Sequence, residues 1–380
     1  MGSTIPDIDR RIDTAFGPVV LRRFPLRQRD PLQAWNAADL LLLEYAAGLS
    51  TPPHRTLLVN DEFGALSIPL GAECCVWTDS QVSNEAIAHN ASGNQLAAAP
   101  RITPVTGSPG REFDLVLLRI PKQLSLLRYQ LRLLAAELPP GSKIVCGGMD
   151  KHLPRACADI IEEYLGPTER HRGGHKARIF SSVVSGKHTG TEVPLQRFYC
   201  EQLGHDVESL PNVFSAAALD IGTRLLLAQL AAREAPGRAV DLCCGNGVIG
   251  LCAMAAQPEL ALDFIDESSL AVASARLNVE RLFPERLQHC SFTQSDGFRQ
   301  FQGPAPDWIL CNPPFHQQHI VDTFTGERLL RQAARVLSPG GELWLVANRH
   351  LGYEKTLARA FASKTLLAEN EKFRVWQAQA

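Results

Sequence analysis

Residues 237–257 have the sequence GRAVDLCCGNGVIGLCAMAAQ, which is the clearest fold signal in this chain. It begins with an apolar run at 239–242 that reads as a buried strand, and a glycine-rich turn and an apolar helix pattern follow. The turn has three glycines with the spacing G-x-G-x-x-G: Gly245, Gly247 and Gly250. Backbone at such a turn closely approaches a ligand, although dinucleotide-binding proteins share this spacing. Asp241 precedes the glycines, and its carboxylate suits a ligand that carries a cationic amine.

Strands and helices alternate through the rest of the second half. Further strands are expected at 260–268, 290–298 and 307–316, with a helix at 270–282 and a helix, a turn and a fifth strand within 329–348. This alternation predicts an α/β fold with a parallel, doubly wound sheet that binds ligands outside the carboxyl ends of its strands. Four polar side chains fall at such ends: Asp241, Asp266, Asp296 and Asn312. A carboxylate at the second strand end commonly holds ribose hydroxyls, which indicates that role for Asp266.

The fourth strand runs into CNPPFH, residues 311–316. Two adjacent prolines do not fit a helix interior and cannot donate to a strand ladder, so they fix a rigid kink at the strand end. A plain turn is the alternative interpretation. The convergence of four polar strand ends favours a functional one.

The glycine turn, the acid of the second strand and N-P-P-F together resemble the class I S-adenosylmethionine-dependent methyltransferases. N-P-P-[FYW] resembles the signature of enzymes that methylate planar nitrogens: adenine-N6, protein-glutamine and ribosomal RNA guanine-N2 methylases. Longer strings resemble the RsmC/RlmG family of ribosomal RNA guanine-N2 methyltransferases over nearly the whole chain, its large-subunit members most closely. They include NVFSAAALDIGTRLLL (212–227), VDLCCGNGVIG (240–250), FIDESSLAVASARLNVE (264–280) and CNPPFHQQH (311–319). One departure is Cys243, where the family usually has glycine.

This resemblance implies S-adenosyl-L-methionine as the cofactor and a guanine N2 of 23S ribosomal RNA as the methyl acceptor, either naked or in a pre-subunit particle. The implied cofactor-binding residues are Phe214, Ser215, Asp241, Gly245, Asn246, Gly247, Asp266, Asp296 and Asn312. Three alternatives remain: a small-subunit guanine-N2 methylase, a DNA or protein amine methylase, and a non-catalytic RNA-binding or assembly module with a vestigial site. DNA and protein methylases usually carry Tyr or Trp where this chain has Phe315.

Three residues are expected to act on the acceptor. The exocyclic amine of guanine is a poor nucleophile because its lone pair is delocalised into the ring. The side-chain oxygen of Asn312 and the carbonyl of Pro313 would each accept one N–H, which favours the pyramidal nitrogen of the transition state. Phe315 would stack on a base that has left its helix.

The first half reads as a degenerate copy of the second. TLLVNDEFGAL (56–66) matches the strand and glycine turn, with Asp61 as an early acid and Gly64 as the remaining glycine. The residues at 119–122 are Arg-Ile-Pro-Lys, without the asparagine or the aromatic ring. We therefore expect two methyltransferase-like (Rossmann-like) domains from an internal duplication: a degenerate one at 1–184, a linker at 185–212 and a catalytic one at 213–380. Two unrelated α/β domains are the alternative.

Charge gives a weaker signal about the partner. The net charge is −2, so composition alone does not indicate nucleic acid. Basic residues nevertheless cluster at 21–30 and 169–178. These clusters are interpreted either as ordinary solvated surface or as an RNA-facing patch. The residues expected to contact RNA are Arg22, Arg23, Arg170, Arg172 and His316.

The remaining sequence features predict an ordinary cytoplasmic protein. The ten cysteines form no Cys-x-x-Cys and are expected to be reduced. The N-terminus does not read as a secretion signal, and no apolar run is long enough for a membrane span. His316 and His319 lack nearby cysteines or carboxylates in a zinc-like pattern, so no metal is expected.

Overall fold

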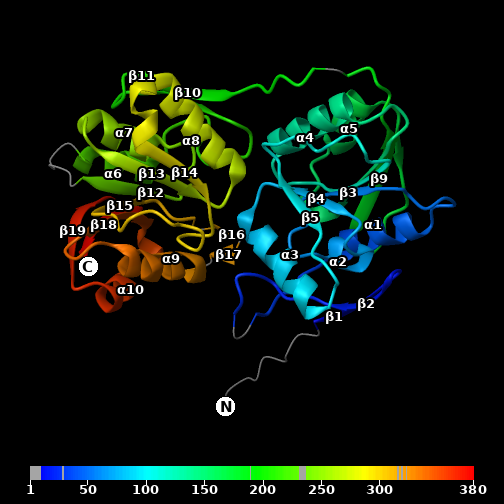
Figure 1. Ribbon diagram of the computed structural model, residues 1–380, viewed down its shortest axis with the longest axis horizontal. Helices are drawn as coiled ribbons and strands as arrows, with labels where there is room; N and C mark the ends of the chain where they lie inside the picture. Colours follow the sequence, from blue (N-terminus) through cyan, green and yellow to red (C-terminus); the bar gives the residue numbers. More distant parts are fainter. Residues whose placement is uncertain are drawn as a thin grey trace, which may run out of the picture. The chain divides into compact units, whose positions relative to one another are not determined.

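The computed structural model describes residues 10–27, 30–188, 190–230, 237–314, 316–317, 320–321 and 323–380. The chain forms two compact units, Met1–Val193 and Pro194–Ala380 (Figure 1). None of the helices in the described part of the chain has the length and apolar character needed to cross a bilayer. All ten cysteines are free, and seven of them are buried.

The second unit contains a seven-stranded sheet in its described residues, with the order β14-β13-β12-β15-β18-β20-β19. The strands are β10 (Gln196–Cys200), β11 (His205–Ser209), β12 (Arg238–Leu242), β13 (Ala261–Asp266), β14 (Cys290–Gln294), β15 (Trp308–Cys311), β16 (His316–Gln317), β17 (Ile320–Val321), β18 (Glu342–Asn348), β19 (Ser363–Glu369) and β20 (Phe373–Gln379). The α-helices are α6 (Ile221–Leu230), α7 (Val248–Ala256), α8 (Ser269–Leu282), α9 (Thr323–Val336) and α10 (Glu354–Ala360).

The central strands are apolar on both faces because helices cover both sides of the sheet. In β15, Trp308 and Leu310 join a core that includes α7, whereas Ile309 and Cys311 join a second core that includes α9. Strand residues alternate between two faces, so each strand contributes to both cores. This is why WILC reads as a continuous apolar run.

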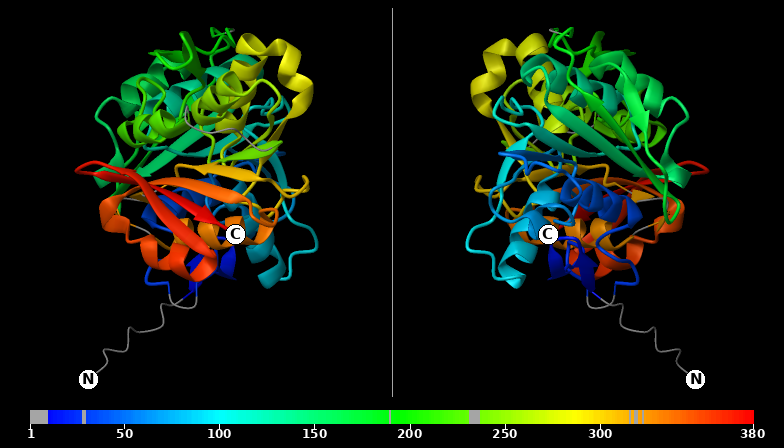
Figure 2. Two further views of the ribbon diagram at one scale, coloured as in Figure 1. Left: turned by 90° about the vertical axis from the view of Figure 1, so that its left-hand side faces the viewer. Right: turned by 90° about the vertical axis from the view of Figure 1, so that its right-hand side faces the viewer.

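The expectation of a parallel sheet holds for five of these seven strands. β14, β13, β12, β15 and β18 pair in parallel, whereas β20 runs antiparallel to both β18 and β19. A short turn joins β19 to β20, and the side chain of Asn370 in that turn accepts hydrogen bonds from the backbone N–H groups of Lys372 and Phe373. Such a short connection joins only antiparallel neighbours. The resulting hairpin forms one edge of the sheet (Figure 2).

The first unit repeats this architecture. Its sheet has the order β5-β4-β3-β6-β7-β9-β8, with the last two strands again antiparallel. The strands are β1 (Arg11–Thr14), β2 (Gly17–Val20), β3 (Thr56–Val59), β4 (Cys75–Thr78), β5 (Arg101–Pro104), β6 (Leu115–Arg119), β7 (Lys143–Met149), β8 (Thr168–Arg170) and β9 (Ala177–Val183). The α-helices are α1 (Ala37–Ala47), α2 (Ser67–Leu70), α3 (Gln81–Gly93), α4 (Leu124–Glu137) and α5 (Cys157–Leu165).

Strand register aligns the two units residue by residue. Val59 pairs with Trp77 and Leu118, just as Leu242 pairs with Ile265 and Cys311. Residues at matched positions then share unusual features. Asn60 and Cys243 both have φ of 62°, Gly64 and Gly247 have φ of 85° and 82°, and Ser80 and Ser268 both cap the next helix. Such agreement is what an internal duplication leaves.

The segment 185–212, expected as a linker, contains the β10–β11 hairpin. Asn278 on α8 fixes this hairpin to the second unit, because its side chain accepts from the N–H of Glu208 (2.9 Å) and donates to the carbonyl of Glu208 (2.7 Å). The division between the compact units accordingly falls at Val193 and Pro194. Part of the segment expected as a linker is therefore folded as a hairpin on the second unit.

Candidate active site at the strand ends of the second unit

Four neighbouring strands end at one edge of the second sheet. In the order β14, β13, β12 and β15, adjacent strands are parallel and in register: Asp266 pairs with Gln294, and Leu242 pairs with Ile265 and Cys311. The residues at or beside these ends are Asp241, Asp266, Asp296 and Asn312. The structure therefore brings all four predicted strand-end residues to one edge.

Asp241 is a fully buried carboxylate with one unused oxygen. Its Oδ2 accepts a hydrogen bond from the N–H of Gly250 at 2.8 Å, whereas Oδ1 has no partner among the described residues. Burial raises the pKa of Asp241 to about 8, and the nearby carboxylate of Asp266 adds to the increase. A buried acceptor without a donor is costly, so this position is suited to a cationic donor supplied by a ligand.

Asp266 ties the second strand end to the glycine turn. Its Oδ2 accepts from the N–H of Gly245 and its Oδ1 from the N–H of Ser268, both at 3.0 Å. Gly245 has φ of 56°, and among the described residues a methyl group added there would meet only Val213, at 4.0 Å. The turn therefore has room beside Gly245 for a group that approaches its backbone closely. Gly247, which directly precedes α7, has a left-handed backbone conformation with φ of 82°.

The third glycine of the motif serves packing. A methyl group at Gly250 would lie 2.5 Å from Phe264 and 2.6 Å from Leu262. Helix α7 therefore lies close against β13 only because Gly250 has no side chain. Cys243, where the family resemblance leads one to expect glycine, adopts a left-handed backbone conformation that glycine adopts with less strain.

Three other residues predicted to bind the cofactor, Asn246, Phe214 and Ser215, differ in their burial and hydrogen bonding. Asn246 is buried and uses its amide within the protein, donating to Ser209 Oγ (3.1 Å) and accepting from the N–H of Val248 (3.3 Å). Phe214 is 57% exposed, and Ser215 has φ of 56° with its hydroxyl donating to the carbonyl of Ala218. Val213, which precedes them, would lie 4.0 Å from a methyl group on Gly245, so the segment 213–215 begins beside the glycine turn.

Asp296 forms a partly buried ion pair that the sequence did not indicate. Arg328, on α9, donates through Nη2 to Asp296 Oδ1. Within the described part of the chain, Oδ2 of Asp296 and the Nε and Nη1 atoms of Arg328 have no hydrogen-bond partners. Arg328 belongs to no motif and lies 32 residues away in sequence, so only the tertiary structure reveals this partner.

Asn312 immediately follows β15, and helix α6 holds its amide. Its Nδ2 donates to Thr223 Oγ1 at 2.9 Å and to Asp220 Oδ2 at 3.3 Å. Among the described residues, no group donates to its Oδ1. Pro313 is buried, Phe315 lies outside the described residues, and His316 begins the β16–β17 hairpin.

The described residues of the first unit hold no matching set of open acceptors. By register, Leu58 occupies the position of Asp241, Thr78 that of Asp266 and Arg119 that of Asn312. Asp61 lies in the turn and not at the position of Asp241, contrary to the simpler sequence alignment. Both of its oxygens accept backbone N–H groups, from Gly64 (3.1 Å) and Ser67 (2.8 Å).

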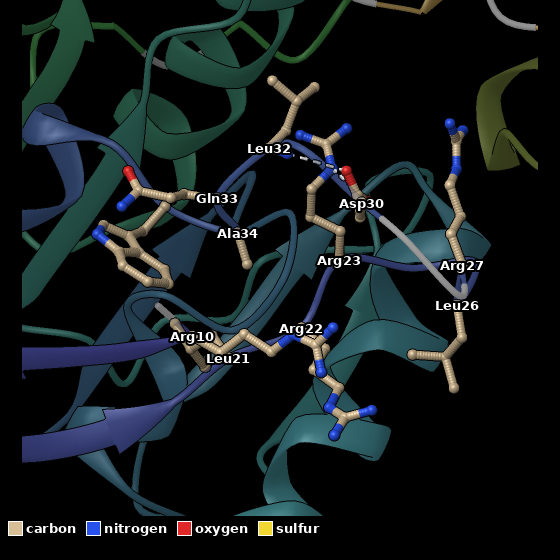
Figure 3. A pocket seen from close by; sticks show the side chains of 11 residues that line it. Arg10, Leu21, Arg22, Arg23, Leu26, Arg27, Asp30, Leu32, Gln33 and Ala34 are labelled. Atoms are coloured by element: carbon tan, nitrogen blue, oxygen red, sulfur yellow. Dashed lines mark hydrogen bonds and ion pairs between the residues drawn. The ribbon is translucent and has the colours of Figure 1, made fainter. Parts of the chain in front are cut away.

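The basic residues of the first unit form separate groups. A pocket is lined by Arg10, Leu21, Arg22, Arg23, Leu26, Arg27, Asp30, Leu32, Gln33, Ala34 and Trp35 (Figure 3). Within it, Arg23 pairs with Asp30 at 3.3 Å and lies over Phe63, whereas Arg22 is exposed. Arg170 lies on β8, 3.7 Å from Asp159, and Arg172 is exposed. Neither of these last two residues lines the pocket. No group of three or more potential metal ligands occurs in the residues that the structure describes.

Comparison with known proteins gives consistent matches over both units. The model of the methyltransferase small domain matches residues 204–377, and that of the RLMG N-terminal domain matches residues 9–186. Ribosomal RNA large subunit methyltransferase G of Ectopseudomonas mendocina (strain ymp) is 39% identical over 370 residues, which cover 96% of this chain and 98% of that protein. The protein of the same name from Stutzerimonas stutzeri (strain A1501) is 38% identical, over 95% and 97% of the two chains.

A solved structure extends the match to the fold. The T. thermophilus 16S rRNA N2 G1207 methyltransferase (RsmC), in complex with AdoMet and guanosine, has a TM-score of 0.75 and 22% identity over 97% of both chains. At this identity the likeness concerns the architecture, which contains the same two methyltransferase-like units. With relatives of 36–39% identity over nearly the full length, the chain belongs to the ribosomal RNA large subunit methyltransferase G family.

Proposed function

We propose that this protein transfers a methyl group from S-adenosyl-L-methionine to the exocyclic N2 of a guanine in 23S ribosomal RNA. The proposal rests on the buried carboxylate of Asp241, one oxygen of which has no partner in the described part of the chain, on the same sheet edge as Asp266 and Asn312. The names of the relatives support a large-subunit substrate. The name of the structural neighbour supports guanine N2 as the methylated atom.

The second unit offers a fitting set of cofactor groups. Asp241 Oδ1 would accept from the cationic amino group, and Asp266 would accept from ribose hydroxyls next to the glycine turn. The open space beside Gly245 admits close approach of the ligand. Asp296, Phe214 and Ser215 would border the rest of the cofactor, whereas Asn246 would act through the backbone of the turn that it holds. When bound, S-adenosylmethionine supplies an electrophilic methyl group.

Asn312 would supply the main chemical assistance. Its Oδ1 and the carbonyl of Pro313 would accept the two N–H groups of the amine, so that the lone pair turns toward the methyl group. The two prolines reduce the freedom of this backbone, which keeps the acceptors in place. Phe315 would stack on the flipped base, and His316 would lie next to it. No metal is needed in this scheme.

The first unit would hold RNA without holding the cofactor. Its strand-end positions carry Leu58, Thr78 and Arg119, none of which resembles the acceptors of the second unit. Arg22, Arg23, Arg170 and Arg172 are the proposed RNA contacts. Arg22, Arg170 and Arg172 are exposed, but Arg170 lies 3.7 Å from Asp159, so Arg22 and Arg172 should contribute most. Arg23 forms an ion pair with Asp30 in the wall of the pocket. The protein would act in the cytoplasm, on naked 23S RNA or on a pre-subunit particle.

Asp241 makes cofactor affinity depend on pH. At pH 6 its carboxyl group is protonated because its pKa is about 8. A cationic amine favours the ionised form, so binding should release a proton, and affinity should rise by up to about tenfold per pH unit between pH 6 and 7.5. Calorimetry in buffers of different ionisation enthalpy measures both quantities. Asp241→Asn should abolish the proton release. Binding of equal strength at pH 6 and 7.5 in the wild type would remove Asp241 from the amine site.

Asn312→Ala should lower turnover by about 10²–10³ while cofactor affinity stays nearly unchanged, because it removes one acceptor used in the transition state. Turnover is measured with ribosomal RNA from cells that lack the protein, and affinity by calorimetry. Asn370→Ala, in the β19–β20 turn, is the control and should keep wild-type turnover in folded protein. Wild-type turnover in Asn312→Ala would exclude the proposed chemistry.

Replacing Arg22 and Arg172 together by Ala should weaken RNA binding and flatten its salt dependence. Each lost phosphate contact lowers the slope of log K against log salt by about 0.7–0.9. The double variant should therefore lose about 1.5 in slope, with cofactor affinity unchanged. Arg128→Ala removes an exposed arginine that already pairs with Glu163 and is the control. If the slope of the double variant matched that of the wild type, RNA would bind elsewhere.

A further inference from the structure

Two side chains at the N-terminus of α6 accept hydrogen bonds from the side chain of Asn312. Asp220 directly precedes this helix, and its Oδ2 accepts from the N–H of Thr223 at 2.9 Å. The same oxygen accepts from Asn312 Nδ2 at 3.3 Å, and Thr223 Oγ1 accepts from Nδ2 at 2.9 Å. Thr223 is 4% exposed, so water does not readily replace this contact. The two acceptors thus engage the nitrogen end of the Asn312 amide.

The first unit has the same arrangement with different chemistry. Helix α1 is capped by Asn36, and its third residue, Asp39, forms a buried ion pair with Arg119. Thr223 is likewise the third residue of α6, and Arg119 matches Asn312 in register. In both units, a side chain at the start of a helix therefore bonds to a side chain at the end of the fourth strand position. In the second unit the side chain at the strand end is Asn312, whose amide has a donor nitrogen at one end and an acceptor oxygen at the other.

We propose that Asp220 and Thr223 are positioning residues that fix the orientation of the Asn312 amide, so that Oδ1 faces the reacting guanine amine. This inference rests on the function proposed above. If the amide were rotated by half a turn, Oδ1 would face the carboxylate of Asp220, and Nδ2 would point a donor at an amine that itself donates. Both contacts would be repulsive. The carboxylate of Asp220, which can only accept, selects the productive orientation before substrate arrives, and the hydroxyl of Thr223 stabilises it by accepting a second hydrogen bond from Nδ2.

The first test compares Thr223→Val with Thr223→Ser. Valine keeps the shape of the side chain and removes the acceptor, whereas serine retains it. We expect kcat to fall about tenfold in Thr223→Val and to recover in Thr223→Ser, with KM for S-adenosylmethionine and thermal unfolding near wild type. Thr356→Val, the same change at a buried site on α10, should leave kcat unchanged. Asp220→Asn retains an oxygen for the helix cap but brings an N–H toward Asn312, and kcat should fall here too.

A double-mutant cycle separates positioning from general support of the fold. If Thr223 acts only through Asn312, then Thr223→Val should cost nothing further in an Asn312→Ala background. Single-turnover transfer of a radiolabelled methyl group measures these low rates. An equal loss in both backgrounds, or wild-type kcat in both Thr223→Val and Asp220→Asn, would overturn the inference. Wild-type turnover is measured first: if it is absent, the proposed function itself fails, whereas an active wild type with unaffected variants rejects only the positioning role.

Discussion

The candidate active site exists because four neighbouring strands pair in parallel and in register. Because β14, β13, β12 and β15 run the same way, their carboxyl ends share one edge of the sheet. Carboxylates and a carboxamide from distant parts of the sequence therefore lie side by side on rigid backbone. The glycine turn after β12 adds room for a ligand, and the packing of α7 through Gly250 keeps that turn close to β13.

In the duplicated first unit, polar side chains at the same edge of the sheet bond to one another and leave few groups for a ligand. Asn60 and Gln130 bond to each other through both amides, and Arg119 is neutralised by Asp39. Asp61 is buried like Asp241, and burial raises its pKa to about 6, but backbone N–H groups satisfy both of its oxygens. A buried acid thus indicates a ligand only when part of it remains unsatisfied. That distinction separates the two halves more clearly than the loss of glycines does.

The sequence predicted local features such as turns and strand ends well. It predicted poorly which side chains bond to each other across the fold. The glycine turn, the strand ends and the duplication follow from apolar runs and short motifs, since these encode backbone conformation directly. The order of β19 and β20 depends on which edge a hairpin joins, and the pairing of Asp296 with Arg328 depends on how α9 packs. The internal use of the Asn246 amide likewise depends on Ser209, a residue of the hairpin that composition alone suggested was a linker. Contacts between residues distant in sequence leave no local pattern.

The most direct test of the account is to identify the methylated atom. Purified protein is incubated with methyl-labelled S-adenosylmethionine and with ribosomal RNA from cells that lack it, and the digested nucleosides are resolved by mass spectrometry. We expect label on guanine N2, in 23S RNA and not in 16S RNA. Label in 16S RNA, on adenine N6 or in protein would contradict it, as would the absence of transfer by protein that binds the cofactor.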